Sequence, residues 1–77
     1  MNTIGERIAY LRKKNNVSQR KLAKDLCLSS GNISSYESNK FKPTTDTVIA
    51  LANYFNVSAD WLLTGKDNAN KSNDVEN

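Results

Sequence analysis

One short pattern occurs three times in this chain. A serine has an apolar residue directly before it and a second apolar residue four positions after it, as in Val17, Ser18 and Leu22. The same pattern recurs at Leu28, Ser29 and Ile33 and at Val57, Ser58 and Leu62. The serine can cap the free N–H groups of a first helical turn, and the two apolar residues can pack together across that turn. Three such starts within 77 residues predict a chain of short helices.

Two further helix starts depend on threonine. Thr3 and Glu6 form a capping box before the first apolar stripe. Thr44 or Thr45 is the expected cap of a fourth helix, directly after a proline. From the first helix to the fifth, the residues expected to face inward are Ile4, Ile8 and Leu11, then Leu22, Ala23 and Leu26, then Ile33, then Val48, Leu51, Ala52 and Phe55, and finally Trp61, Leu62 and Leu63.

Asparagine and glycine indicate where the helices end. The first helix is expected to fade at Asn15 and Asn16, which favour turns. The third is expected over residues 30–38, stopping near Asn39, and the fifth over residues 59–64 before Gly65. Residues 66–77 contain almost nothing apolar and are predicted to be a disordered tail or a truncated linker. Because no segment alternates with period two, the prediction is an all-α fold, a compact five-helix bundle in one domain over residues 1–65.

Composition excludes several classes of protein. The chain has no histidine and a single cysteine, Cys27. A Cys/His metal site, a disulfide framework and histidine-based catalysis are therefore excluded. No apolar run approaches the roughly 20 residues of a membrane span, and no activated nucleophile is visible. We therefore expect neither a membrane protein nor an enzyme, no metal and no cofactor, and we expect Cys27 to be a small buried side chain in a reducing cytoplasm.

Charge is divided unevenly along the chain. Residues 1–42 carry nine lysines and arginines against three acidic residues, a net charge of +6, whereas residues 43–77 carry a net charge of −3. A basic half favours a polyanionic partner. An ordinary solvated surface explains the same charges equally well, so charge alone does not decide between them.

The third helix has an unusual face. At about 100° per residue, one arc of this helix holds only small residues, namely Ser30, Gly31, Ser34, Ser35 and Ser38. The opposite arc holds Asn32, Ile33, Tyr36 and Glu37. A solvated helix face normally carries long charged side chains. A face of serine and glycine instead permits close approach to another surface.

Groups suited to phosphates flank this helix. The second and third helices are separated by two or three residues, which is typical of a helix-turn-helix over about residues 18–38. Gln19 lies at the start of the second helix, where free N–H groups favour an anion. Lys21 and Lys24 extend a basic rim, and Lys40 and Lys42 follow the far end of the third helix. This arrangement is expected for a helix in the major groove with flanking backbone contacts.

Four motifs over residues 4–65 make the sequence resemble a known family. They are S-Q-x-x-L-A, I-S-x-Y-E, a proline before the fourth helix, and V-S-x-D-W-L-L-x-G. Together they resemble the Cro and repressor type of helix-turn-helix domain of temperate phages and bacterial regulators. The resemblance implies a lambda-repressor-like fold that binds double-stranded operator DNA.

The resemblance also implies roles for individual residues. Gln19 matches a glutamine that contacts phosphate and braces the recognition helix. Arg12 and Glu37 match a partly buried structural ion pair between the first and third helices, and Tyr36 and Trp61 match aromatic core positions. The positions nearest the bases are matched by Ser29, Ser30, Gly31, Ser34 and Ser35. The phosphate-contacting segment is matched by Ser38, Asn39 and Lys40.

Two residues depart from the family pattern. Cys27 stands where the family usually has a glycine at the end of the second helix, so a residue with a Cβ must adopt the left-handed turn. Gly31 stands where many relatives carry a long side chain such as glutamine. Base readout would then depend on hydroxyl groups, on Asn32 or on bridging water.

The predicted function is that of a sequence-specific transcriptional regulator, a repressor that binds a palindromic operator as a dimer. The predicted location is the cytoplasm, with the bacterial nucleoid. Trp61, Leu62 and Leu63 are the candidates for a weak homodimer interface that DNA strengthens, because three large apolar residues exceed what one face of a six-residue helix needs. The alternative is a protein-binding module on the same fold, such as an antitoxin or a regulatory subunit.

Overall fold

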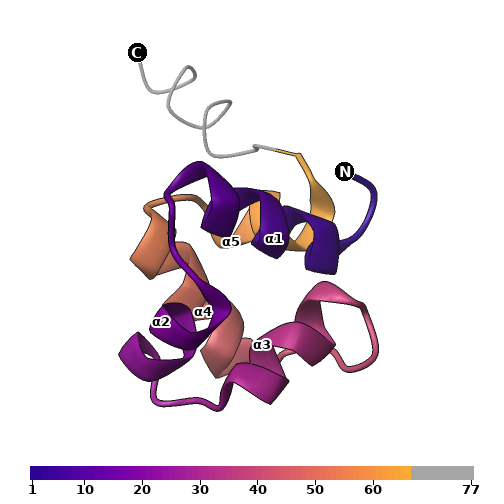
Figure 1. Cartoon of the computed structure of the whole chain (residues 1–77). Helices are drawn as coiled ribbons and strands as arrows, with labels where there is room; N and C mark the ends of the chain where they lie inside the picture. Colours follow the sequence, from indigo (N-terminus) through magenta and orange to yellow (C-terminus); the bar gives the residue numbers. More distant parts are fainter. Residues whose placement is uncertain (67–77) are drawn as a thin grey trace.

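Five α-helices make up most of residues 1–66, the part of the chain that this computed structural model describes (Figure 1). They are α1 (Ile4–Lys14), α2 (Gln19–Asp25), α3 (Ser30–Glu37), α4 (Thr45–Phe55) and α5 (Ala59–Thr64). The prediction of an all-α fold of five helices is confirmed, with α3 ending one residue earlier than expected and Thr44 as the cap of α4. The predicted tail lies outside the described residues, apart from Lys66.

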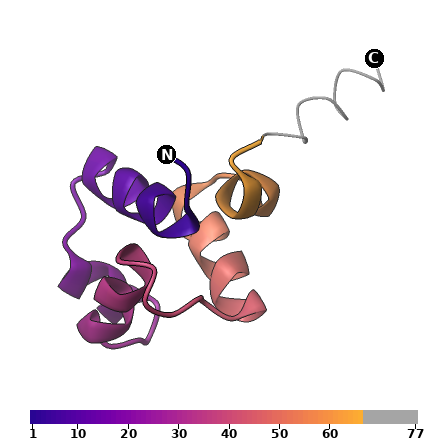
Figure 2. The same ribbon diagram turned by 90° about the vertical axis from the view of Figure 1, so that its right-hand side faces the viewer.

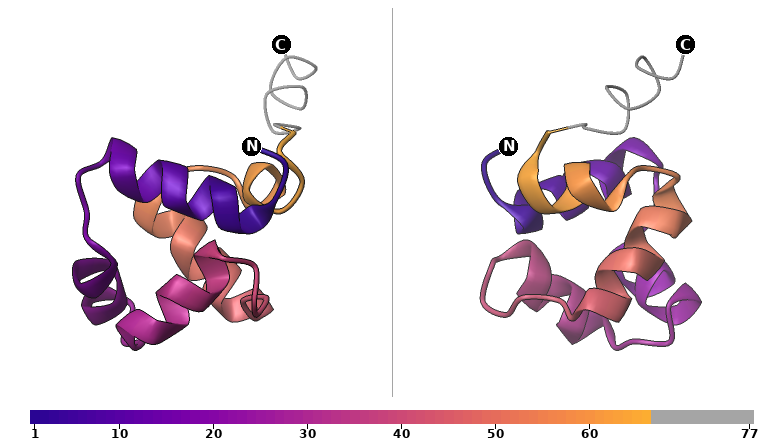
Figure 3. Two further views of the ribbon diagram at one scale, coloured as in Figure 1. Left: turned by 45° about the vertical axis from the view of Figure 1, so that its right-hand side comes forward. Right: turned by 180° about the vertical axis from the view of Figure 1, so that it is seen from behind.

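The helices form two halves joined by α4. In Figure 1, α1 and α5 lie together at the top and α2 and α3 lie below them. Figure 2 shows that the start of α1 lies beside the end of α3. Seen from behind in Figure 3, α4 runs from the lower half to the upper half. The packing partners agree with these views, because α3 contacts α2 and α1, and α5 contacts α4 and α1.

Each helix contributes one fully buried aliphatic side chain to a shared core. These side chains are Ile8, Leu22, Ile33, Leu51 and Leu62, each with no exposed surface. Leu22, Ile33 and Leu62 are also the inner residues of the three repeated serine patterns. The apolar residues before those serines, Val17, Leu28 and Val57, pack against the same core. The pattern that sets the helix starts therefore also anchors three of the five helices.

The predicted serine caps are present at all three of these starts. The Ser18 Oγ accepts a hydrogen bond from the backbone N–H of Lys21 at 3.0 Å, and the Ser58 Oγ accepts one from Trp61 at 3.0 Å. The Ser29 Oγ accepts the N–H of Asn32 at 3.1 Å. Each bond satisfies one of the N–H groups that a first turn leaves without a helical partner.

The first four helices end in the same backbone arrangement. Asn16, Cys27, Asn39 and Asn56 have φ values between 56° and 63°, in the left-handed region. After each of them, the next N–H bonds to the carbonyl five residues before it, at 2.8–2.9 Å. This is the hydrogen bond of a Schellman motif, which closes a helix and turns the chain away from its axis.

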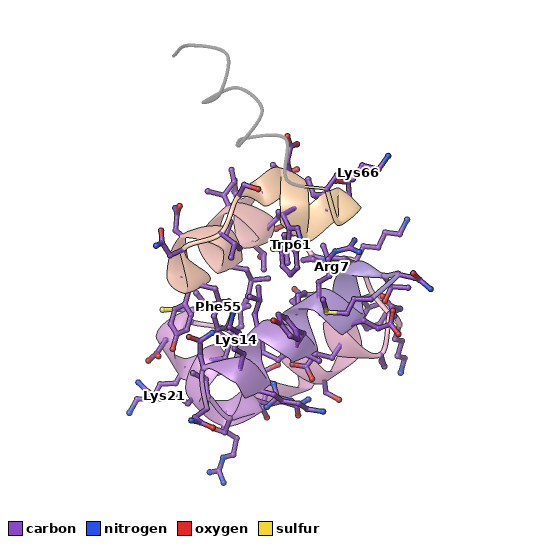
Figure 4. All side chains as sticks on the ribbon, turned by 90° about the horizontal axis from the view of Figure 1, so that it is seen from above. Arg7, Lys14, Lys21, Phe55, Trp61 and Lys66 are labelled. Carbon is purple, nitrogen blue, oxygen red and sulfur yellow. The ribbon has the colours of Figure 1, made fainter. Side chains whose placement is uncertain are left out.

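Arg7 is the main core residue that the sequence analysis missed. Arg7 is only 4% exposed, so its charge does not contribute to a basic surface. Its Nε donates to the carbonyl of Leu62 at 2.7 Å and its Nη2 donates to the carbonyl of Leu63 at 2.9 Å. Arg7 thus satisfies carbonyls at the end of α5 and lies between α1 and α5 (Figure 4). A cation at a helix C-terminus is also favoured by the helix dipole.

Cys27 is exposed, so the prediction that it is buried is wrong. Its left-handed conformation, with φ at 59°, belongs to the turn between α2 and α3, and the thiol faces solvent there. Asparagine and glycine adopt this conformation with little strain, whereas a cysteine Cβ makes it unfavourable.

We predict that Cys27→Gly raises the free energy of unfolding by about 1 kcal/mol, because glycine removes the strain of a Cβ in the left-handed region. Chemical denaturation followed by circular dichroism measures the change. Cys27→Ala is the matched control, since it removes the thiol and keeps the Cβ, and it should give no gain. Equal stabilisation by both variants would show that the thiol, and not the backbone, is the unfavourable group.

Candidate nucleic-acid interface

Helix α3 is oriented by two buried side chains. Ile33 has no exposed surface and Tyr36 is 7% exposed, so both face the core. The residues that the sequence analysis placed nearest the bases lie outside this buried edge. Ser29, Ser30, Gly31, Asn32 and Ser34 are exposed, and Ser35 is half-buried. The outer surface of α3 is therefore formed by small polar residues, as the helical wheel predicts, and Asn32 joins them.

The Asn32 side chain is held by Ser29. The hydroxyl of Ser29 donates to the Asn32 Oδ1, while the same oxygen accepts the Asn32 backbone N–H. This pair leaves the side-chain amide N–H groups of Asn32 as the donors on an exposed position of α3. Such donors are suited to acceptors such as a guanine O6 or N7.

The fold does not require a glycine at residue 31. A Cβ added there would meet only the Ser29 Oγ, at 3.8 Å, with open space otherwise. A glycine inside a helix costs about 1 kcal/mol relative to alanine. Because no contact within the described residues explains Gly31, its small size is relevant to what approaches α3 from outside.

Arg12, Glu37 and Gln19 are brought together between α1, α2 and α3. The Arg12 Nε donates to one Glu37 oxygen at 2.6 Å and the Arg12 Nη2 donates to the other at 3.0 Å. The Gln19 Nε2 also donates to Glu37, at 3.0 Å. The ion pair is shielded from solvent, with 14% of the Arg12 side chain and 10% of the Glu37 side chain exposed. Glu37 raises the pKa of the Arg12 guanidinium above its ordinary value.

This network connects the end of α3 to both preceding helices. A bidentate pair fixes direction as well as distance, so it limits rotation of α3 about its own axis. Gln19 therefore braces α3 through Glu37, and it remains half-buried at the first residue of α2.

The lysines of the predicted basic rim differ in their surroundings. Lys21 forms an ion pair with Asp25 at 3.0 Å, and the Tyr54 hydroxyl donates to the same carboxylate. The Tyr54 and Lys21 hydrogen bonds lower the pKa of Asp25, and Asp25 in turn raises the pKa of Lys21. Part of the Lys21 charge is thus compensated within the protein.

The segment after α3 carries exposed cations. Lys40 and Lys42 are exposed on the loop between α3 and α4, and the Lys40 Nζ lies 5.7 Å from the ring centre of Phe41. The Ser38 hydroxyl donates to the Ser35 carbonyl at 3.2 Å. Asn39, expected to contact phosphate, is exposed; its Oδ1 accepts the Gly5 N–H and its Nδ2 donates to the Thr3 Oγ1.

The three candidates for a dimer interface have different environments. Leu62 is fully buried, so it cannot contact a partner, and its assignment to an interface is corrected. Trp61 is half-buried beside Tyr10, with their ring centres 6.4 Å apart. Leu63 is 53% exposed and is the apolar side chain of α5 that is open to a partner.

Residues 1–66 show neither a metal-binding cluster nor a membrane-spanning helix. They contain no group of three or more His, Cys, Asp or Glu side chains that could hold a metal ion. None of the described helices has the length and apolar character needed to cross a membrane.

The fold and this surface define a helix-turn-helix domain, with α2 and α3 as its two helices. The family model described as a helix-turn-helix domain matches residues 5–68. The chain belongs to this family.

Two bacterial regulators and one solved repressor structure are similar to the chain. It is 38% identical over 74 residues to the HTH-type transcriptional regulator ImmR of Bacillus subtilis and covers 58% of that protein. It is also 38% identical over 74 residues to the HTH-type transcriptional regulator DicA of Escherichia coli and covers 55% of it. In both alignments 96% of this chain is matched, so it spans a little over half the length of these relatives.

The solved structure is that of the P22 c2 repressor in complex with a synthetic operator. Superposition of the two structures gives a TM-score of 0.81 at 33% sequence identity, and the match covers 86% of this chain and all of the P22 c2 repressor chain. The likeness therefore extends over most of the chain and is not confined to α2 and α3.

We predict that Arg12→Ala lowers the free energy of unfolding by about 1–3 kcal/mol, because it removes the cation that faces the shielded Glu37 carboxylate. Glu37→Ala should cost a comparable amount, and the double variant less than the sum, since the two residues contact each other. Chemical denaturation of the wild type, the two single variants and the double variant completes this double-mutant cycle. Additive losses would contradict an energetic role for the ion pair.

Proposed function

We propose that residues 1–65 form the DNA-binding domain of a transcriptional repressor, and that α3 enters the major groove of an operator. The observation that carries this proposal is the exposed surface of α3. It is formed by serine, glycine and asparagine, it lacks long charged side chains, and it is followed by the exposed lysines 40 and 42. Direct readout requires a helix that can approach base edges closely, with cations placed at the phosphates on either side.

The similarity to the P22 c2 repressor supports the same proposal, because that protein was solved bound to an operator. Repression would follow from occlusion. Two α3 helices in successive major grooves, about 34 Å apart, would cover a palindromic site and exclude RNA polymerase. This mechanism requires no cofactor. The protein would act in the bacterial cytoplasm, where the chromosome lies.

We predict that the protein enriches defined sequences from a random library of DNA duplexes. If about five phosphates are neutralised per protomer, log K for an enriched duplex should fall with log[salt] at a slope of about −4 to −5. Fluorescence anisotropy between 50 and 300 mM salt, as an approximate range, measures the slope. Lys42→Ala should weaken binding to all duplexes alike, whereas Ser30→Ala should change the preference among them.

Two outcomes would contradict this function. One is a slope shallower than about −1, which would exclude extensive phosphate contacts. The other is the absence of any enriched sequence, which would favour the protein-binding module. Gly31→Ala is an informative companion, because it should leave the fold at least as stable while reducing affinity for the enriched duplex.

We further propose that the protein binds its operator as a homodimer through α5. Leu63 is exposed on α5, and α5 lies in the upper half in Figure 1, so a partner there leaves α3 uncovered. A surface this small gives a weak free dimer, which binding to two adjacent half-sites strengthens. An isologous contact about a two-fold axis would direct both α3 helices to one side of the duplex.

We predict that Leu63→Glu abolishes cooperative binding to an enriched palindrome and leaves the circular dichroism spectrum unchanged, because the side chain is already largely exposed. The affinity for the palindrome should fall by about tenfold or more. Ile49→Glu is the matched control, since Ile49 is 48% exposed on α4 and lies outside α5. Wild-type cooperativity in Leu63→Glu would exclude this surface.

A further inference from the structure

The end of α3 is attached to the start of α1 by one side chain. Asn39 follows α3 in the left-handed conformation, with φ at 63°. Its Oδ1 accepts the backbone N–H of Gly5 at 3.1 Å, and its Nδ2 donates to the Thr3 Oγ1 at 2.9 Å. Each bond is long-range: Asn39 is 34 positions from Gly5 and 36 positions from Thr3 in the sequence. Both ends of the Asn39 amide are therefore used in contacts with α1.

The contact depends on a close approach of the two backbones. A Cβ at Gly5 would lie 2.4 Å from the Tyr36 carbonyl oxygen and 2.7 Å from the Asn39 Oδ1. Only glycine fits at this separation. The N–H of Gly5 belongs to the first turn of α1, whose donors have no helical partner, and Asn39 supplies that partner. The first turn of one helix thus lies against the last carbonyls of the other, an arrangement that the helix dipoles favour.

The left-handed backbone at residue 39 does not by itself require the side-chain hydrogen bonds that Asn39 makes. Asn56 has nearly the same conformation after α4, with φ at 56°, and closes its helix with the same type of hydrogen bond. A glycine would satisfy this conformation equally well. The two bonds to α1 are therefore an additional property of residue 39, beyond ending the helix.

The position of Asn39 in the chain suggests what these bonds do. Lys40 follows it directly and Lys42 comes two residues later, both exposed. Two backbone N–H groups of this segment donate to the Ser35 carbonyl on α3, that of Lys40 at 2.9 Å and that of Phe41 at 3.3 Å. These two bonds attach the segment to α3, and Asn39 attaches its start to α1.

We propose that Asn39 is a positioning residue for DNA binding. It holds Lys40 and Lys42 beside the end of α3, where they can contact DNA phosphates when α3 lies in the major groove. This role does not require a contact of the Asn39 side chain with DNA, because its Oδ1 and Nδ2 act through their bonds to Gly5 and Thr3. The inference rests on the proposed DNA-binding function and adds to it a residue that acts through its two neighbouring lysines.

Asn39→Gly tests this role, with Asn56→Gly as the matched control. Glycine preserves the left-handed backbone and removes only the side chain. The probe is a fluorescent duplex enriched by the wild-type protein, together with a mixed-sequence duplex of the same length. We expect Asn39→Gly to weaken binding to both duplexes by about threefold to tenfold and to make the salt slope shallower by about one. Asn56→Gly should bind as the wild type does.

A second background shows whether the effect passes through the lysines. In Lys40→Ala/Lys42→Ala, adding Asn39→Gly should produce no further loss of affinity and no further change of slope. Amide hydrogen exchange provides the structural readout. The Gly5 N–H should exchange faster in Asn39→Gly, whereas the core amide of Ile8 should remain protected, which shows that the fold persists.

Three results would overturn the inference. Asn39→Gly could bind with wild-type affinity and slope, or its loss could persist undiminished without the lysines, or the Gly5 N–H could exchange as fast in the wild type as in the variant. Each of these leaves the proposed function in place. A wild-type protein that fails to bind any duplex would instead overturn both proposals, and this outcome is seen before any variant is compared.

Discussion

The chain depends on a core to which each short helix contributes one completely buried aliphatic side chain. Helices of six to eight residues, such as α2, α3 and α5, are not stable alone. They persist because Leu22, Ile33 and Leu62 are buried in the shared core and because a serine caps each first turn. The loss of any one anchor therefore affects the placement of its whole helix, including the surface that the helix presents to solvent.

Much of this fold can be predicted from the sequence because its strongest signals are local. A serine cap and its flanking apolar pair lie within six residues, so the starts of α2, α3 and α5 follow from the sequence directly. The left-handed residues 39 and 65 were predicted on the same basis. Among the site residues, the exposure of Ser30, Gly31 and Ser34 follows from the positions of Ile33 and Tyr36 on the same helix.

The remainder depends on contacts between residues far apart in the sequence. Arg7 has the sequence context of a surface cation, and only the position of the α5 carbonyls shows why it is buried. The bonds of Asn39 to α1 depend likewise on the approach of two distant helix ends. Leu62 and Leu63 are adjacent and similar in hydrophobicity, and the packing of α5 decides which one faces the core. For Arg12 and Glu37, the family resemblance supplied a pairing that spacing alone does not contain.

The residues that hold α3 in place and those on its outer surface form separate sets. Ile33, Tyr36 and Glu37 make the contacts to the core and to Arg12. Of the outer residues, Gly31 has open space around its missing Cβ. New side chains can therefore be introduced on the outer surface at little cost to folding. In evolutionary terms, the target preference of such a domain can diverge rapidly while its scaffold is retained, and α3 is a suitable place to begin a library of redesigned specificities.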